Sequence, residues 1–170
     1  NYLQFGTAPI VFVVHPDVTG IDNVTPEQIL DIYSGRTRNW GDLDARPGKI
    51  YPITREAGDS CLTVLAQEIR GFADVDKQAA KPLYTTQDAI DALSRHSGTI
   101  GFVPLPVVAG NELRILKING IYPSIENVQN GIYPYGIPLA LVYKNEPQGL
   151  AERFVEFLSS SEGKDIMMKM

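Results

Sequence analysis

The sequence has few of the residues that disulfide frameworks and metal centres require. Cys61 is the one cysteine in 170 residues, so an internal disulfide and a paired-cysteine metal site are both excluded. The two histidines, His15 and His96, are far apart in the sequence and have no second ligand at a typical metal-site spacing. The sequence therefore predicts no metal and no other cofactor.

Long apolar runs and an excess of basic charge are also missing. The longest apolar run, at 8–14, has the length of a strand and falls far short of the roughly 20 residues of a membrane-spanning helix. A net charge of −5 argues against nucleic acid as a partner, because a phosphate backbone needs a basic face. We expect neither direct membrane insertion nor nucleic-acid binding, although a local pocket for one small anion is compatible with an acidic chain.

Catalytic and nucleotide-binding motifs are absent as well. The sequence contains no GxSxG elbow, no GxGxxG fingerprint and no GxxxxGK[ST] loop, and neither histidine has an evident catalytic partner. No nucleophile–base pair can be assembled from the sequence alone. We therefore predict that the protein is not an enzyme.

What is present is an ordinary globular composition, with 44% hydrophobic and 21% charged residues. Alternating strand and helix patterns predict an α/β fold, a mixed sheet flanked by helices. We expect strands at 8–14, 49–55, 98–105, 112–118 and 138–143, and helices at 24–35, 59–70, 85–96, 147–160 and 161–170. The segment 72–84 is ambiguous.

Several side chains carry more specific expectations. Thr25 and Gln28 have capping-box spacing at the start of a helix. Trp40 is expected to fill the gap beneath the loop 36–48, although it could instead stack on a ligand. The strand 138–143 is expected to be buried, and the last long helix to turn one apolar face inward: Leu150, Phe154, Phe157 and Leu158.

The segment REAGDSC, at 55–61, is the main candidate site. It lies between a predicted strand and a predicted helix, whose N-terminal N–H groups favour anions. Arg55 could supply a bidentate fork to an oxyanion, Gly58 lets the backbone come close, and the Ser60 hydroxyl and Cys61 thiol could donate. The alternative is structural: Asp59 caps the helix, Gly58 makes the turn and Arg55 is a surface charge.

Six segments together resemble the phosphate-binding proteins of bacterial phosphate ABC transporters, which are type II periplasmic solute-binding proteins. These segments follow one another along nearly the whole chain: VFVVHPD, VTPEQILDIYSGRTRNWGDL, IYPITREAGDSCLTVL, SGTIGFVPL, GIYPYGIPLALVY and RFVEFLSSSEGKDIM. The resemblance implies an export signal outside this chain and a periplasmic or extracellular location. It also implies oxyanion capture between two lobes, delivery to an ABC permease in the membrane, and no catalysis.

The family's anion loop is similar to residues 55–61, with one clear departure. Arg55 matches the family's arginine, whereas Asp59, Ser60 and Cys61 stand where the family has serine, glycine and threonine. The resemblance thus implies anion binding by the arginine and leaves phosphate or a related oxyanion as the ligand. Thr85 and Thr86, at the start of the next helix, are further candidates, while a ligand-free interaction or sensor module that keeps the fold is the alternative.

The resemblance also implies a division of the chain. Residues 1–135 would form a solute-binding lobe that includes the anion loop, and residues 136–170 a returning strand and helices of the hinge or first lobe. Family members usually have a further half-lobe before the segment that matches 6–14. The sequence is therefore expected to be a lobe taken from a longer protein, a proteolytic remnant or a natural short form.

Overall fold

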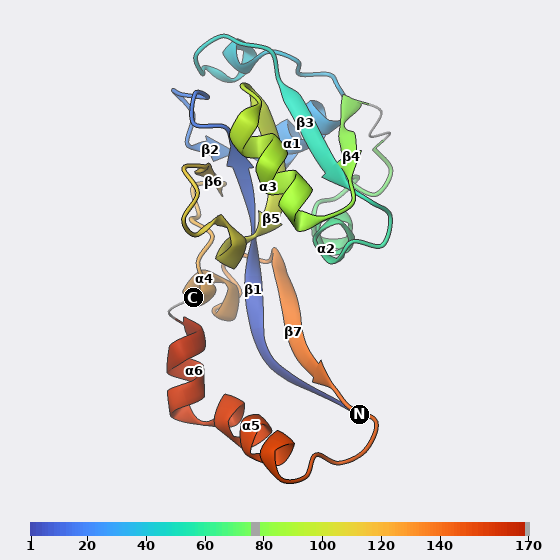
Figure 1. Ribbon diagram of the computed structural model, residues 1–170. Coiled ribbons are helices and arrows are strands. Elements are labelled where there is room, and N and C mark those ends of the chain that lie inside the picture. The colour runs from blue at the N-terminus through green and yellow to red at the C-terminus, as the bar shows by residue number, and fades with distance from the viewer. Residues whose placement is uncertain (76–78, 169–170) are drawn as a thin grey trace.

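The structure, a computed structural model, describes residues 1–75 and 79–168 and forms a mixed α/β fold (Figure 1). The strands are β1 (Tyr2–Val14), β2 (Asn23–Val24), β3 (Tyr51–Arg55), β4 (Lys81–Leu83), β5 (Thr99–Pro104), β6 (Arg114–Ile118) and β7 (Gly136–Val142). The α-helices are α1 (Pro26–Tyr33), α2 (Ser60–Glu68), α3 (Thr86–Arg95), α4 (Ile125–Gln129), α5 (Leu150–Ser159) and α6 (Ser161–Met168). Two short 3-10 helices, η1 (Trp40–Leu43) and η3 (Leu105–Val108), complete the order.

The sheet is mixed, as the sequence predicts, and β1 is its longest strand. Its order is β2-β6-β1-β5-β3-β4, with β7 paired to the first half of β1. The second half of β1 pairs antiparallel with β5 and β6, whereas β3 lies parallel to both β5 and β4. In Figure 1, β1 therefore runs upward from the lower ribbon that it forms with β7 into the part of the sheet that lies among the helices.

Two hydrophobic cores lie on opposite faces of the sheet, because successive side chains of a strand alternate between faces. From β1, Phe12 joins the core beneath α1 and α2, while Val13 joins the core beneath α3. Phe12, Tyr33, Phe72 and Phe102 form an edge-to-face cluster in the first core, with ring centroids 5.4 to 6.4 Å apart. Each face of the sheet is therefore apolar, and helices pack against both faces.

The predicted start of α1 and the predicted role of Trp40 are both confirmed. Thr25 caps α1, its hydroxyl accepting from the backbone N–H of Gln28 while the Gln28 side chain accepts from the Thr25 N–H. Trp40 is 1% exposed, and its indole N–H donates to the carbonyl of Gly98. A buried indole with a satisfied N–H fills the space under the loop and leaves no face for a ligand.

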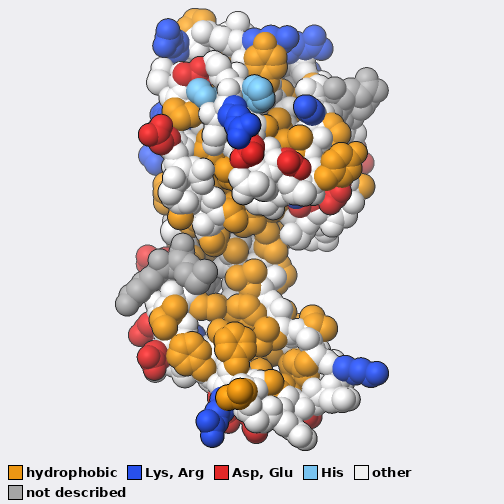
Figure 2. Space-filling view, in the orientation of Figure 1, with side chains coloured by type: hydrophobic (Ala, Val, Ile, Leu, Met, Phe, Trp, Pro, Cys, Tyr) orange, Lys and Arg blue, Asp and Glu red, His pale blue; other side chains and the backbone are white. Residues whose placement is uncertain are grey.

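The burial predicted for the C-terminal elements is wrong. β7 is mostly exposed, with Val142 84% exposed, and in α5 only Leu158 of the predicted inward residues is buried. Leu150 is 83% exposed and Phe154 53%. The physical reason is that β7 pairs only with β1 in the described sheet, and the described helices leave much of it exposed. Figure 2 shows hydrophobic side chains gathered over this lower part of the molecule.

Smaller differences concern boundaries. β1 begins at Tyr2, six residues earlier than the strand predicted at 8–14, and part of the ambiguous segment forms β4. The short elements β2, α4, η1 and η3 were not predicted. The end of the last predicted helix, at 169–170, lies outside the described residues, as do residues 76–78 of the ambiguous segment. Among the described helices, none combines the length and apolar character needed to cross a membrane.

Candidate functional site

The candidate anion site lies where three parallel strands end. β5, β3 and β4 are neighbours and run in the same direction, so their carboxyl ends meet at one edge of the sheet. α2 begins after β3 and α3 begins after β4, so both helix N-termini lie at this edge. Ligands of open α/β sheets bind at such edges, and two helix N-termini add positive potential there.

Arg55 is the last residue of β3, and its side chain is only 8% exposed. Its Nε donates to Oδ2 of Asp59 at 3.2 Å, and its Nη2 donates to the Tyr84 carbonyl at 3.4 Å. Its Nη1 is buried and has no hydrogen-bond partner in the structure. A buried guanidinium donor without a partner raises the free energy of the folded protein. An acceptor that binds to Nη1 would remove this cost.

Asp59 caps α2, as the structural interpretation predicts, and also neutralises Arg55. Its Oδ1 accepts from the N–H of Leu62 at 3.1 Å, while Oδ2 accepts from Arg55. Its own backbone N–H donates to the carbonyl of Glu56. Gly58 has φ of +92°, so the turn before the cap favours glycine. One carboxylate therefore occupies the Nε edge of Arg55 that a bidentate oxyanion would otherwise use.

Ser60 and Cys61 differ in their access to a ligand. Ser60 is exposed at the first position of α2, where its N–H has no intrahelical partner. Cys61 is 3% exposed, and burial, with a smaller contribution from the Asp59 carboxylate, raises the pKa of its thiol to about 12. Cys61 is therefore a neutral thiol at physiological pH, able to act only as a weak hydrogen-bond donor.

Of the two threonines predicted at the site, Thr86 lies at it and Thr85 serves as a cap. The Thr85 hydroxyl accepts from the N–H of Asp88 at 3.0 Å. Thr86 lines a small hollow of about 50 Å³ together with residues of β3, α2 and β5. The other side chains of this hollow are Arg55, Asp59, Ser60, Cys61, Phe102, Val103 and Pro104. Gly58 and Thr85 lie outside its lining.

Two features of the site depart from the sequence-based reasoning. The alternative that Arg55 is a surface charge is wrong, because its position at a strand end packs it under the helix N-termini. The Tyr84 carbonyl that holds Arg55 was not predicted, and a backbone acceptor leaves no mark in the residue types. The Arg55–Asp59 pair could have been noticed from its four-residue spacing.

A second polar cluster joins His15, Asp17 and Ser97 near the opposite ends of β3 and β5. His15 Nδ1 lies 2.5 Å from Asp17 Oδ1, a hydrogen-bond partner that was not evident from the sequence. The Ser97 hydroxyl donates to Asp17, and this bond, with smaller contributions from His15 and Gly98, lowers the pKa of the Asp17 carboxyl. The carboxylate stands between the hydroxyl and the imidazole, so among these three residues the imidazole does not contact the hydroxyl as it does in a Ser-His-Asp triad.

Among known proteins, the chain is similar to several phosphate-binding proteins. The chain is 23% identical over 159 residues to "Phosphate-binding protein PstS" of Bacillus subtilis (strain 168), covering 94% of this chain and 52% of that protein. It is 26% identical over 128 residues to "Phosphate-binding protein PstS 2" of Streptococcus pneumoniae serotype 4, covering 71% of this chain and 43% of that protein. The chain therefore spans about half the length of these relatives.

Solved structures show the same fold. A Clostridium perfringens protein crystallised with bound phosphate overlays 99% of this chain with a TM-score of 0.86 at 23% identity; the overlay covers 69% of that protein. An ABC-type phosphate transport receptor from Vibrio cholerae gives a TM-score of 0.73 at 19% identity, covering 99% of this chain and 70% of the receptor. The family model for the PBP superfamily domain matches residues 2–162, and the chain therefore belongs to the PBP superfamily domain family.

Proposed function

We propose that the chain is the oxyanion-binding lobe of an extracytoplasmic solute-binding protein. Its ligand is an inorganic oxyanion, phosphate first, and it delivers this ligand to an ABC permease in the membrane without catalysis. The location is periplasmic or extracellular. The names of the relatives support this function, since the curated matches described above are phosphate-binding proteins.

The observation that carries the proposal is the state of Arg55. A buried guanidinium with a free Nη1 lies between the N-termini of α2 and α3, beside the Ser60 hydroxyl and Thr86. Charge-assisted hydrogen bonds from such a donor are short and strong, and both helix ends favour a negative ligand. We propose that Arg55 supplies charge, and that Ser60, the Cys61 N–H and Thr86 orient the anion. Gly58, Asp59 and Thr85 shape the loops.

The rival function is a ligand-free interaction or sensor module, and one observation favours it. Asp59 already gives Arg55 a counter-charge at 3.2 Å, and it also caps α2. An anion that enters must share Arg55 with this carboxylate, unless the anion carries a proton that it can donate to Asp59. The two functions therefore differ in whether phosphate binds at all.

A thermal-shift titration separates the two functions. A ligand at one hundred times its Kd adds about 2.7 kcal/mol, which for this size of chain raises Tm by about 5–10 °C. We expect a shift with phosphate, none with a neutral sugar, and loss of the phosphate shift in Arg55→Ala and Arg55→Lys. Arg55→Lys keeps the positive charge but loses the planar guanidinium, so it separates loss of the guanidinium hydrogen bonds from loss of folding. Sulfate and molybdate test which oxyanion the site prefers.

Arg153→Ala, far from the site on α5, serves as the matched control and should shift as the wild type does. The titration is run on the longest form of the protein that can be obtained, because a partner lobe would strengthen binding. No shift with any anion, in a protein that is folded by circular dichroism, would favour the interaction module.

Replacing Asp59 with serine is expected to tighten phosphate binding roughly tenfold. The substitution removes a negative charge next to the guanidinium, frees its Nε, and keeps a residue that can cap α2. Isothermal titration calorimetry of Asp59→Ser and Asp59→Asn against wild type measures the change. Unaltered binding in both variants would mean that the carboxylate is not the obstacle, and weaker binding would mean that it helps to hold the ligand.

We further propose that residues 136–170, together with the first half of β1, belong to a second lobe or hinge. The ribbon of β1 and β7 has two strands over most of its length, which is marginal for an isolated sheet. The ribbon and the helix α5 expose large apolar side chains, among them Tyr2, Leu150 and Phe154. An apolar surface of this kind marks a face that packs against further structure.

A charge substitution on this face tests the lobe proposal. If Leu150 and Phe154 pack only against further structure, Leu150→Lys/Phe154→Lys should change the unfolding free energy of this chain by less than about 0.5 kcal/mol. It should also reduce fluorescence of a bound hydrophobic dye. Urea unfolding measures the first quantity; a loss of about 2 kcal/mol or more would show that both side chains stabilise the chain by itself. Phe102→Lys, in the core, is the destabilising control.

A further inference from the structure

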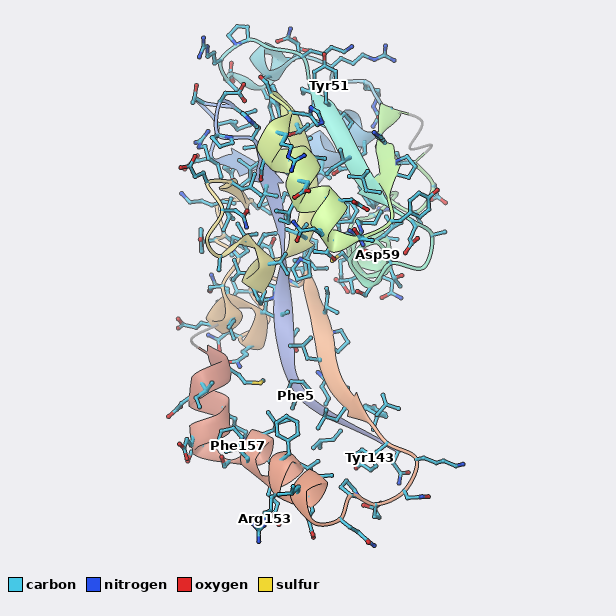
Figure 3. All side chains as sticks on the ribbon, in the orientation of Figure 1. Phe5, Tyr51, Asp59, Tyr143, Arg153 and Phe157 are labelled. Atoms are coloured by element: carbon cyan, nitrogen blue, oxygen red, sulfur yellow. The ribbon has the colours of Figure 1, made fainter. Side chains whose placement is uncertain are left out.

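A basic depression lies at the end of the lobe opposite the candidate anion site. It is formed by the loop 36–50, the start of β3 and the end of α3, and has a volume of about 1110 Å³. Tyr51 begins β3 on its wall, whereas Arg55 ends the same strand, about 13 Å farther along. In Figure 3 the labels of Tyr51 and Asp59 mark these two ends. The depression is therefore a separate surface from the hollow at Arg55.

The charge of this depression is opposite to that of the protein. Five of the chain's fifteen lysines and arginines line it: Arg38, Arg46, Lys49, Lys81 and Arg95. The one acidic side chain of the lining, Asp17, already accepts hydrogen bonds from Ser97 and from the Gly98 N–H. On a chain with a net charge of −5, such an excess of one sign produces a local positive potential.

Most of this positive charge has no counter-charge in the described part of the chain. Arg46, Lys49 and Lys81 have no ion-pair partner among residues 1–75 and 79–168. Arg95 makes one exposed pair with Asp91 at 3.6 Å, a type of contact that contributes little. These side chains can therefore form new ion pairs without first breaking strong ones.

The shape of the depression indicates the kind of ligand. The cationic groups come from the loop 36–50, the start of β4 and the end of α3, and among the described residues that line it no buried side-chain donor lacks a partner. A single small anion needs converging donors, as at Arg55, whereas charges spread around a wide hollow match several acidic groups along a chain. Tyr51, 48% exposed with the Lys49 ammonium 4.9 Å from its ring centre, adds an aromatic contact typical of protein interfaces.

We propose that this basic depression docks an acidic peptide segment of a partner protein. The segment presents several Asp or Glu side chains to the rim and packs against Tyr51. A flat lipid surface cannot enter a hollow of this kind, so the concave shape favours a peptide over a membrane. The proposal is independent of phosphate binding, because it uses none of the residues around Arg55.

Fluorescence anisotropy with a labelled glutamate decapeptide tests the proposal. At low ionic strength we expect saturable binding that weakens as salt is added, and none with a lysine decapeptide. Arg46→Glu/Lys49→Glu should raise the Kd about tenfold or more, because two attractive contacts become repulsive. Lys144→Glu/Arg153→Glu, which makes the same charge change away from the depression, should change the Kd less than twofold.

Two further arms make the result decisive. Arg55→Lys should leave peptide binding unaltered, so failure of the phosphate proposal cannot be confused with failure of this one. Phosphatidylglycerol vesicles are tested alongside. Vesicle binding without peptide binding, equal losses in both double variants, or no peptide binding by folded wild-type protein would each overturn the proposal.

Discussion

Replacing Trp40 with alanine is expected to lower the free energy of unfolding by about 3–5 kcal/mol. The indole is 1% exposed, belongs to the core beneath α1 and donates to the carbonyl of Gly98. Its removal leaves a cavity that the sheet and the helices cannot close, and it leaves the Gly98 carbonyl with one donor fewer. Urea unfolding followed by far-ultraviolet circular dichroism measures the loss.

Trp40→Phe provides the matched variant for this prediction. Phenylalanine keeps most of the apolar volume and loses the indole N–H, so we expect a smaller loss of about 1–3 kcal/mol. A Trp40→Ala protein as stable as wild type would show that the tryptophan does not belong to the core. Phosphate-induced shifts that change in Trp40→Phe but not in stability-matched controls would revive the ligand-stacking interpretation.

Gly98→Ala is expected to destabilise the protein by about 2–5 kcal/mol. Gly98 has φ of +74°, and a Cβ there would overlap the carbonyl of Lys49. The backbone of Gly98 cannot move aside freely, because its carbonyl accepts from the Trp40 indole and from the Tyr51 N–H. Strain and overlap therefore add at one position. Thermal unfolding compared with wild type measures the effect.

Gly110→Ala separates the two contributions. Gly110 also has positive φ, +80°, but nothing lies within 4 Å of an added Cβ. The control thus carries only the conformational cost of a left-handed alanine, about 1 kcal/mol. Equal losses in the two variants would mean that the contact with Lys49 is relieved without cost.

The parts of the fold that the sequence predicts correctly depend on local signals. The capping box of Thr25 and the cap of Asp59 each involve two residues three positions apart, and both form as predicted. The strand at 8–14 is visible because it is short, apolar and β-branched. Such signals depend on backbone groups within one turn or one strand, so they do not require knowledge of the rest of the chain.

The exposure of β7 and α5 could not be predicted, because burial depends on what else packs against an element. Residues 138–143 have the composition of a core strand, and the spacing of Leu150, Phe154 and Leu158 is that of a helix with one inward face. Both patterns describe faces suited to burial, while the structure describes only β1 as a partner for the strand. The pattern identifies the apolar face of each element, but it does not say which other part of a protein packs against that face.

The candidate site was predicted in part. Arg55, Asp59, Ser60, Cys61 and Thr86 are brought together around one hollow, because strands that are neighbours in the sheet place their following loops side by side. The Thr85 hydroxyl was predicted to lie at the site, but it caps α3 instead. The Tyr84 carbonyl and the wall formed by Phe102 and Pro104 depend on the order of the strands, which residue types alone do not determine.

The hollow at Arg55 is built from one short part of the chain. All of its lining comes from residues 55–104, within a β-α-β-α-β stretch, residues 51–104, that contains β3, α2, β4, α3 and β5. If the hollow binds the anion that we propose, recognition is encoded in this short stretch, whereas β1 and β7 frame it. Substitutions within the stretch would then alter the hollow while the pairing of β1 with β7 stayed the same.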